Sequence, residues 1–529
     1  MTLSRRDAIA QLAAITAMTT LPRHGWTLPS PSSDPLDGTI AEYLAGFHSG
    51  KWSAEEVTRA ALERCQRLGT KYHAIDALSE TAIADAKASD VRRKAKRLRG
   101  ALDGVPVFGK AIYDMDGLPT TASNAEWARL FPDPVKRDSI EIQRLRAAGA
   151  IVLGKTAADD FAYRGEGTSS HTGQVLNPYD RTGTRTPGGS SAGSAVSVAC
   201  GMAFAALGTD DGGSNRIPAV CTGVVGMKPT FGLVPRNGVI PTWPYLDTHG
   251  PLARHVADAA LLLSVVAGPD PSDPLALTGK WDPSPLLRLR DNALHRVRLG
   301  LVEAHVPRAQ MTEEALATWN RAVADLQAAG AEVVSFDAPV TLQNYRAQFA
   351  ESASRRGDVK PDSRSPAPTA NAYQLYFAGR SDDPRADMKM GYPAYQQFYD
   401  VLPKTFEECE PLFDQPMAQD AAGQSFARSR TEVVAALEKA MEAAGVSAMV
   451  YPTMPFNAFS LETGWPDLRT ALGYGNFLGL PEVSVPAGLG ADGMPALNLS
   501  VVGLPGTDAQ ILAFAHAYER QSKRFVAPK

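Results

Sequence analysis

The sequence has few of the residues that bind metal ions or carry out thiol chemistry. Its four cysteines (Cys65, Cys200, Cys221 and Cys409) lie far apart and form no CxxC pair, and its nine histidines contain no HExxH pattern. These spacings are the usual marks of zinc sites and redox dithiols. We therefore expect no metal and no cofactor, and we interpret Cys200 and Cys221, which have apolar neighbours, as buried free thiols.

The sequence also has no large excess of positive or negative charge. The net charge is −4, and the 53 Lys and Arg residues are scattered along the chain. A nucleic-acid surface needs a concentrated basic patch, so this pattern argues against nucleic acid and favours a small neutral substrate. The longest mildly apolar stretch near the N-terminus, 11–21, is too short to span a bilayer, and no membrane span is expected.

Apolar residues, glycine and proline are plentiful. With 529 residues and 44% hydrophobic composition, the chain is able to bury a large core, and 45 Gly with 39 Pro suit a loop-rich α/β enzyme. No oligomeric state follows from these patterns.

The N-terminus has the features of an export signal. The run SRRD at residues 4–7 precedes the apolar stretch and then polar, Pro-rich sequence. This order is typical of a twin-arginine signal, which predicts a periplasmic or otherwise exported protein. The alternative is a chance arginine pair on a disordered tail of a cytoplasmic protein. Residues 1–35 are assigned to this signal and the disordered segment after it, and residues 36–529 to the folded domain.

Local patterns predict helices early in the chain. Ser53 and Glu56 have the spacing of a capping box, and Trp52 and Val57 that of a hydrophobic staple. With the Ala- and Lys-rich segment 80–98, the helix that follows Ser53 is expected to form an N-terminal helical layer on the body.

Three later segments share a helix that stops at Ala-Ala-Gly before an apolar run of strand length. They are 144–156, 325–336 and 440–453, with Gly149, Gly330 and Gly445 at the helix ends. Glycine is favoured just past a helix. Repeated helix-to-strand units predict one large α/β domain, whose central twisted sheet is mixed but mostly parallel and is covered by helices on both faces.

The segment 352–387 differs from these units. It is polar, Pro-rich and weakly periodic, which predicts a surface insertion or lid. Its aromatic residues, Tyr373, Tyr376 and Phe377, either cover a pocket or pack the insertion onto the body.

The letters of residues 149–156, GAIVLGKT, match a phosphate-binding loop. A phosphate-binding loop follows a strand and opens a helix, whereas here a helix comes first and the middle of the run is itself a predicted strand. The inverted order argues against nucleotide binding.

Two serines lie in glycine-rich segments that suit acyl-transfer chemistry. Ser190 is within TPGGSSAGS at 186–194, and Ser214 is within GTDDGGSNRIP at 208–218. Neither has the GxSxG pattern of a serine paired with histidine. A buried lysine without a carboxylate partner is able to stay neutral and act as a base, and Lys110 follows the apolar run 105–109. Together they suggest a Ser/Ser/Lys hydrolase.

With these two serine segments and Lys110, the chain resembles the amidase signature family. The two serines are 24 residues apart with small residues between them, and RIP follows Ser214. GMKPT at 226–230, DTHGP at 247–251, GLP at 479–481 and VPAG at 485–488 also match that family. The resemblance covers most of 40–270 and returns at about 445–520.

The resemblance implies a role for each residue of the motif. Ser214 would be the nucleophile, Lys110 the neutral base, and Ser190, after a cis Gly189–Ser190 peptide, the proton relay between them. The backbone N–H groups of four residues would form the oxyanion hole: Asp211, Gly212, Gly213 and Ser214. Three further residues would hold the loop: Ser191, Asp210 and Arg216.

Each residue taken singly also has a structural explanation. Ser190 and Ser191 suit helix N-caps, Lys110 a lysine at a strand end, and Asp210 an ordinary ion pair with Arg216.

The sequence departs from the family's pattern near these residues. Ala111 follows Lys110 where an acidic residue is common, with Asp114 further on; Ala157 replaces an asparagine. Asp211 and Asn215 add polarity beside the predicted oxyanion hole.

Three functions are considered. The first is a stand-alone amidase that cleaves the C–N bond of an amide, anilide or carbamate. The second is an amidotransferase subunit of the same family, which hands ammonia to a partner, and the third is a catalytically silent binding protein on this fold. Four aromatic residues near the motifs are candidates for an apolar acyl pocket or for core packing: Tyr113, Phe231, Trp243 and Tyr245.

Overall fold

The computed structural model describes residues 34–380, 382–466 and 470–528. The predicted twin-arginine signal therefore lies outside the described residues. Within them, no helix is long and apolar enough to cross a membrane.

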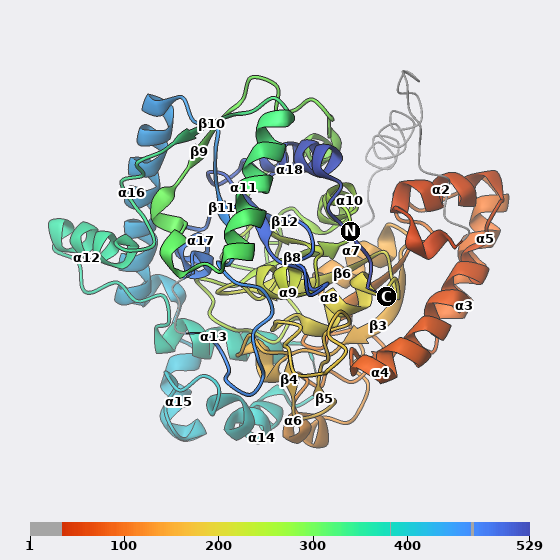
Figure 1. Cartoon of the computed structure of the whole chain (residues 1–529). Helices are drawn as coiled ribbons and strands as arrows, with labels where there is room; N and C mark the ends of the chain where they lie inside the picture. Colours follow the sequence, from red (N-terminus) through yellow and green to blue (C-terminus); the bar gives the residue numbers. More distant parts are fainter. Residues whose placement is uncertain (1–33, 381, 467–469, 529) are drawn as a thin grey trace.

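The described residues are built around one large mixed sheet of 11 strands (Figure 1). In spatial order the strands are β1 (Ile75–Leu78), β3 (Ile151–Thr156), β2 (Pro106–Lys110), β6 (Ala205–Asp210), β8 (Thr248–Ala253), β7 (Val225–Lys228), β12 (Glu482–Pro486), β13 (Asn498–Val502), β11 (Ala448–Pro452), β9 (Arg298–Leu301) and β10 (Glu332–Ser335). A separate two-stranded sheet joins β4 (Thr168–Ser169) to β5 (Gly173–Gln174).

The α/β class and the mixed sheet flanked by helices are confirmed, but parallel pairing is less frequent than expected. Of the ten pairings within the large sheet, four are parallel and six antiparallel. The parallel pairs lie toward both sides of the sheet, where β3, β10 and β11 end the predicted helix-to-strand units. The centre, from β6 to β13, is antiparallel.

The three helix-to-strand units form as predicted. They are α7 (Ile140–Ala147) before β3, α11 (Glu313–Ala328) before β10, and α16 (Ala421–Ala444) before β11. The glycines between them have positive φ values of +87°, +98° and +64°, which favour glycine. The GAIVLGKT run is thus a helix end followed by the buried strand β3, as its order indicated.

The N-terminal helical layer contains α2 (Ile40–Ser49), α3 (Ala54–Arg64) and α5 (Ala82–Lys94). The capping box at Ser53 forms: the Glu56 N–H donates to Ser53 Oγ at 3.1 Å, and the Ser53 N–H donates to Glu56 Oε2 at 2.9 Å. Helices α3 and α5 pack on each other and on β3.

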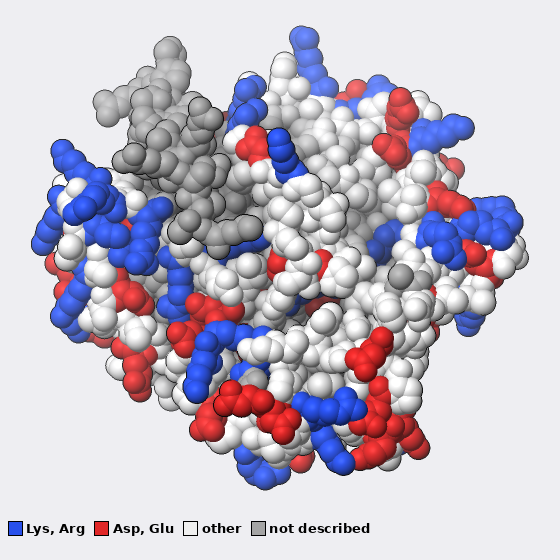
Figure 2. Space-filling model, turned by 180° about the vertical axis from the view of Figure 1, so that it is seen from behind, with Lys and Arg blue, Asp and Glu red and all other residues white. Residues whose placement is uncertain are grey.

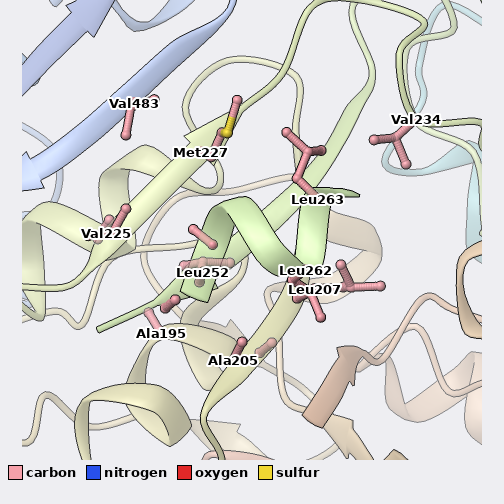
Figure 3. Close-up of a cluster of buried hydrophobic side chains, with 14 of the residues drawn as sticks. Ala195, Ala205, Leu207, Val225, Met227, Val234, Leu252, Leu262, Leu263 and Val483 are labelled. Atoms are coloured by element: carbon pink, nitrogen blue, oxygen red, sulfur yellow. The ribbon is translucent and has the colours of Figure 1, made fainter. Parts of the chain in front are cut away.

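The central core lies between the sheet and the helices that pack on it. Helix α8 (Ala192–Ala199) contacts β6, α10 (Val256–Val266) contacts β8, and α18 (Asp508–Ser522) contacts β12. Figure 3 shows Leu207 of β6, Leu252 of β8 and Met227 of β7 in one buried apolar cluster. This packing fixes the ends of β2 and β6, which carry residues of the candidate site.

The segment 352–387 is largely helical. It spans the end of α12 (Tyr345–Arg356), α13 (Pro366–Phe377) and the start of α14 (Pro384–Gln396). Two of its prolines start helices, a position where proline needs no N–H partner, which explains why a Pro-rich sequence is helical. Tyr373, Tyr376 and Phe377 are buried, so they pack this segment onto the body. Its motion as a lid stays a prediction.

The remaining α-helices of the described residues are short connections and caps. They are α4 (Thr70–Tyr72), α6 (Ala125–Leu130), α9 (Arg216–Cys221), α15 (Phe406–Phe413) and α17 (Leu472–Leu478). All four cysteines are free thiols; Cys221 is buried as expected and Cys200 is partly exposed. On the face seen in Figure 2, basic and acidic side chains are interspersed.

Candidate active site

Two adjacent parallel strands bring the predicted base to the serine loops. Strand β2 ends at Lys110 and its neighbour β6 ends at Asp210, so both segments leave the sheet at the same edge. The Lys110 Nζ lies 2.7 Å from Ser190 Oγ and 2.9 Å from Thr209 Oγ1. All three side chains are buried, so this polar contact is shielded from solvent.

Burial changes the protonation of this lysine. Removal from water lowers the pKa of Lys110 to about 8, although the nearby carboxylates of Asp211 and Asp159 oppose the shift. A lysine with this pKa is partly neutral near physiological pH. Its lone pair is then able to accept a proton from Ser190 across the same 2.7 Å contact.

Ser190 is held by a tight turn. The Gly189–Ser190 peptide is cis, as the family resemblance implied. The Ser190 carbonyl accepts the Asp159 N–H at 3.2 Å. A Cβ at Gly189 would lie 2.0 Å from Asp159 Oδ2, so only glycine fits beside this carboxylate.

Ser191 joins the two serine loops. Its N–H donates to the Ser214 carbonyl at 3.1 Å, and its hydroxyl donates to Asn215 Oδ1 at 3.1 Å. Ser191 precedes α8 but makes no side-chain capping bond to it. The structure therefore gives this hydroxyl a role in joining the loops and not in capping the helix.

Ser214 borders a cavity of about 220 Å³. Its side chain is mostly buried, at 8% exposure, and within the described part of the chain its hydroxyl makes no hydrogen bond. The Lys110–Ser190 link of the predicted relay is therefore present, whereas the link from Ser190 to the Ser214 hydroxyl is not formed as a hydrogen bond.

The predicted oxyanion loop keeps three available donors. The Gly213 N–H donates to Asp210 Oδ1 at 2.8 Å, so the expectation that it binds an oxyanion needs correction. The N–H groups of Asp211, Gly212 and Ser214 donate to no other described residue. Gly213 instead shapes the turn, with φ at +122°.

A buried ion network supports this loop from behind. Arg216 donates from Nη2 to Asp210 Oδ1 at 2.8 Å and from Nη1 to Glu482 Oε2 at 2.7 Å. Asn476 Nδ2 donates to the Asp210 carbonyl at 2.8 Å. Burial alone would raise the pKa of Asp210, but the Arg216 charge outweighs it and lowers that pKa to about 2. The Asp210–Arg216 ion pair is fully buried, unlike an ordinary ion pair on the surface.

Asp211 connects the oxyanion loop to the cavity wall. Its Oδ1 accepts the Thr242 hydroxyl at 2.6 Å and the Trp243 N–H at 3.3 Å. Burial, followed by the charge of nearby Asp247, raises the pKa of Asp211 well above its ordinary value.

The other departures from the family pattern have structural partners. Asn215 points into the sheet, where Nδ2 donates to the carbonyls of Met227 at 3.1 Å and Gly250 at 3.2 Å. The Ala157 carbonyl accepts the Gly193 N–H at 2.9 Å. Asp114 accepts the Tyr376 hydroxyl at 2.9 Å and so ties α13 to the segment after β2.

One of the four aromatic candidates borders the cavity. Trp243 lines it, whereas Tyr113, Phe231 and Tyr245 are absent from its lining. Tyr113 is fully buried and donates to the Gly208 carbonyl at 3.0 Å. The guanidinium of Arg430 lies over Phe231, 4.4 Å from its centroid.

Tyr245 is buried beside helix α16. A Cβ at Gly423 would lie only 2.3 Å from its ring. The three residues that do not line the cavity therefore serve in packing. Other lining side chains had no signal in the sequence motifs: Arg164, Arg364, Tyr399 and Trp465.

Two buried polar residues were also missed by sequence reasoning. Thr209, which contacts Lys110, lies inside the glycine-rich segment 208–218, whereas Asp159 lies outside every motif. Within the described residues, no group of three or more His, Cys, Asp or Glu side chains is placed to hold a metal ion.

The chain is similar to known proteins in sequence and in fold. The family model described as Amidase matches residues 56–512. A glutamyl-tRNA(Gln) amidotransferase subunit of Symbiobacterium thermophilum is 34% identical over 91% of this chain and 96% of its own, and the same subunit of Myxococcus xanthus is 34% identical over 92% and 98%. Among solved structures, the native peptide amidase of Stenotrophomonas maltophilia is similar, with a TM-score of 0.77, 29% identity, and coverage of 95% of this chain and 99% of that one.

Proposed function

The chain belongs to the amidase family, and from that membership we propose that it cleaves the C–N bond of an amide through an acyl-enzyme on Ser214. The observation that carries the proposal is the buried 2.7 Å contact between Lys110 Nζ and Ser190 Oγ, beside the loop that holds Ser214. A silent binding protein has no need of such a contact.

The first step forms the tetrahedral adduct that precedes the acyl-enzyme. Ser214 Oγ attacks the amide carbonyl carbon while its proton passes to Ser190, and the Ser190 proton passes to the neutral Lys110 amine. This transfer requires the Ser190 and Ser214 hydroxyls to approach when substrate binds. The negative charge that develops on the carbonyl oxygen is stabilised by the free N–H groups of Asp211, Gly212 and Ser214.

The second step releases the products. When the C–N bond breaks, the leaving nitrogen takes a proton that returns from Lys110 through Ser190. Water then attacks the Ser214 ester and gives up its proton along the same route. The free acid leaves, and Ser214 recovers its proton, so the site returns to its starting state.

Two biological roles for this chemistry, an amidotransferase subunit and a stand-alone amidase, each have support of their own. The curated relatives, which are more similar in sequence than the peptide amidase, favour an amidotransferase subunit that releases ammonia for a partner. The aromatic wall of the cavity favours a stand-alone amidase acting on an aromatic amide, because glutamine has no ring to fill it.

An assay of the purified chain separates these two roles. We would measure ammonia or amine release from glutamine, benzamide, an anilide, a carbamate and a matched ester. Turnover of aromatic amides by the chain alone supports the stand-alone enzyme. Glutamine cleavage that needs added partner subunits supports the amidotransferase. If the folded protein reacts with a fluorophosphonate probe but turns over none of these amides, the proposed chemistry is contradicted.

We also propose export through the twin-arginine route. The support is the SRRD run at 4–7 and the apolar stretch that follows it. Fractionation of a bacterial host that expresses the full chain tests this, with Arg5→Lys and Arg6→Lys combined as the variant. Loss of the periplasmic pool in the variant supports export, whereas a cytoplasmic location for both proteins contradicts it.

A further inference from the structure

One wall of the cavity beside Ser214 is aromatic. Trp243 packs edge-on against Tyr399, with ring centroids 5.1 Å apart and an interplanar angle of 73°. The Tyr399 hydroxyl donates to the Phe161 carbonyl at 2.8 Å, which fixes the ring. Both rings line the cavity, so a flat apolar group on a substrate has a rigid surface to contact.

Arg364 lies over this wall. Its guanidinium carbon is 5.0 Å from the centroid of Trp243. Residues on both sides of Arg364 are anchored: the Asp362 N–H donates to the Ala422 carbonyl at 3.2 Å, and the Ser365 hydroxyl donates to Asp420 Oδ1 at 2.7 Å. The Arg364 side chain is nevertheless exposed. An anchored loop thus presents a charged group at the cavity.

A second arginine reaches the cavity from another segment. Arg164 follows the 3-10 turn η3 (Asp160–Ala162) and precedes Gly165. A Cβ at Gly165 would lie 3.3 Å from Ile217 and 3.6 Å from Trp465, so the backbone beside Arg164 packs against the wall that faces the substrate space.

Neither cation has a neutralising partner in the part of the chain that the structure describes. Neither Arg164 nor Arg364 forms an ion pair there, whereas Arg137 and Arg380, which lie beside the buried Asp114, both do. Both side chains are exposed, so water solvates them and no buried charge is left unpaired. These two are therefore available to a ligand.

The carboxyl group of Asp211 also lines the cavity, but in the described residues it binds the wall and pairs with neither arginine. Asp211 accepts two hydrogen bonds from the wall, from Thr242 and from the Trp243 N–H. Its pKa is raised well above the ordinary value by burial and then by Asp247, which favours the uncharged form. The cavity lining thus combines two arginines, an aromatic wall and one carboxyl group that already binds the wall.

We infer that the preferred substrates are amides that carry both an aromatic group and a carboxylate, with the ring against Trp243 and Tyr399 and the carboxylate bound by Arg364 and Arg164. This inference rests on the proposed amide cleavage and names its substrate class. A guanidinium binds a carboxylate through two parallel charged hydrogen bonds, which gives selectivity as well as affinity.

Matched pairs of amides test the inference and locate the carboxylate. On the acyl half, 4-carboxybenzamide is compared with 4-methylbenzamide; on the amine half, N-benzoylglycine is compared with N-propylbenzamide. We expect kcat/KM for the charged member of at least one pair to exceed that of its neutral partner by about tenfold or more. A ratio near one in both pairs overturns the inference.

Variants assign the effect to the two arginines. Arg364→Gln and Arg164→Gln should each lower the charged-to-neutral ratio of kcat/KM, together by about tenfold, and Arg364→Lys should restore part of it. Arg290→Gln, at an exposed arginine outside the cavity lining, is the matched control and should leave the ratio unchanged. An unchanged ratio in the double variant contradicts the inference.

A binding measurement separates this inference from the proposed function. In Ser214→Ala, the same amides are titrated while the intrinsic tryptophan fluorescence, to which Trp243 and Trp465 of the cavity contribute, is followed. Tighter binding of the charged members without any turnover in the wild type sustains the site and rejects the chemistry. Turnover in the wild type with equal binding of both members sustains the chemistry and rejects the site.

Discussion

The side-chain nitrogen of Lys110 lies 2.7 Å from the hydroxyl oxygen of Ser190, although 80 positions separate the two residues in the chain. The parallel pairing of β2 with β6 and the turn before α8 bring them together. Because both groups are buried, the protein surroundings set the pKa of Lys110 below that of a lysine in water.

The pH dependence of kcat/KM should follow this lysine. Its pKa, about 8, is below that of a free lysine, so the neutral form that accepts the Ser190 proton increases as pH rises through that value. Activity should fall below about pH 8 and level off above it. A rate that is independent of pH between 6 and about 9.5 would contradict the assigned base.

Lys110→Met should leave the fold intact and lower kcat/KM by about 10²–10⁴-fold, because the methionine fills the buried space without a base. Circular dichroism and thermal melting check the fold, and single-turnover kinetics check the chemistry. Full activity in a folded Lys110→Met protein would mean that another group is the base.

Ser190→Ala should lower kcat much more than it raises KM, because Ser190 moves protons and lines no part of the cavity. We expect a loss of about 10²–10⁴-fold. Thr209→Val removes the other hydroxyl that contacts Lys110 and is the matched control. A loss in Thr209→Val as large as that in Ser190→Ala would reduce Ser190 to a structural role.

The two glycines of the oxyanion loop should respond differently to alanine. A Cβ at Gly213 would lie 2.9 Å from Ile217 and from Leu472 on a backbone with φ of +122°, so Gly213→Ala should destabilise the protein by about 1–3 kcal/mol. A Cβ at Gly212 meets nothing within 4 Å and enters the cavity. Gly212→Ala should therefore keep the melting temperature and lower kcat/KM. Equal melting temperatures for both variants would contradict this assignment.

Arg216 should be essential for stability. Arg216→Met leaves Asp210 and Glu482 buried without their cation, which should cost about 3–5 kcal/mol in the free energy of unfolding. Urea denaturation measures this loss. Arg298→Met, which removes an exposed pair with Glu332, is the control and should cost less than about 1 kcal/mol.

Features that depend on local chemistry were predictable from the sequence. Gly149, Gly330 and Gly445 mark helix ends because glycine adopts positive φ readily, and the capping box at Ser53 is a local pattern. Lys110 was found because an apolar run leads it inward.

Features that depend on tertiary packing were not predictable. Arg364, Tyr399 and Trp465 come from segments without a motif, and only the folded chain places them at one cavity. Tyr113 lies next to a motif yet faces the core. The use of the Gly213 N–H by Asp210 depends on side-chain position, which sequence spacing does not contain.

Active-site labelling tests the central claim most directly. A fluorophosphonate probe should add once to the wild-type chain, on the peptide that contains Ser214, and intact-mass spectrometry should show no adduct on Ser214→Ala. Labelling should be much slower in Lys110→Met, because the nucleophile then has no base. Undiminished labelling of Ser214→Ala, or an adduct mapped to another residue, would contradict the account.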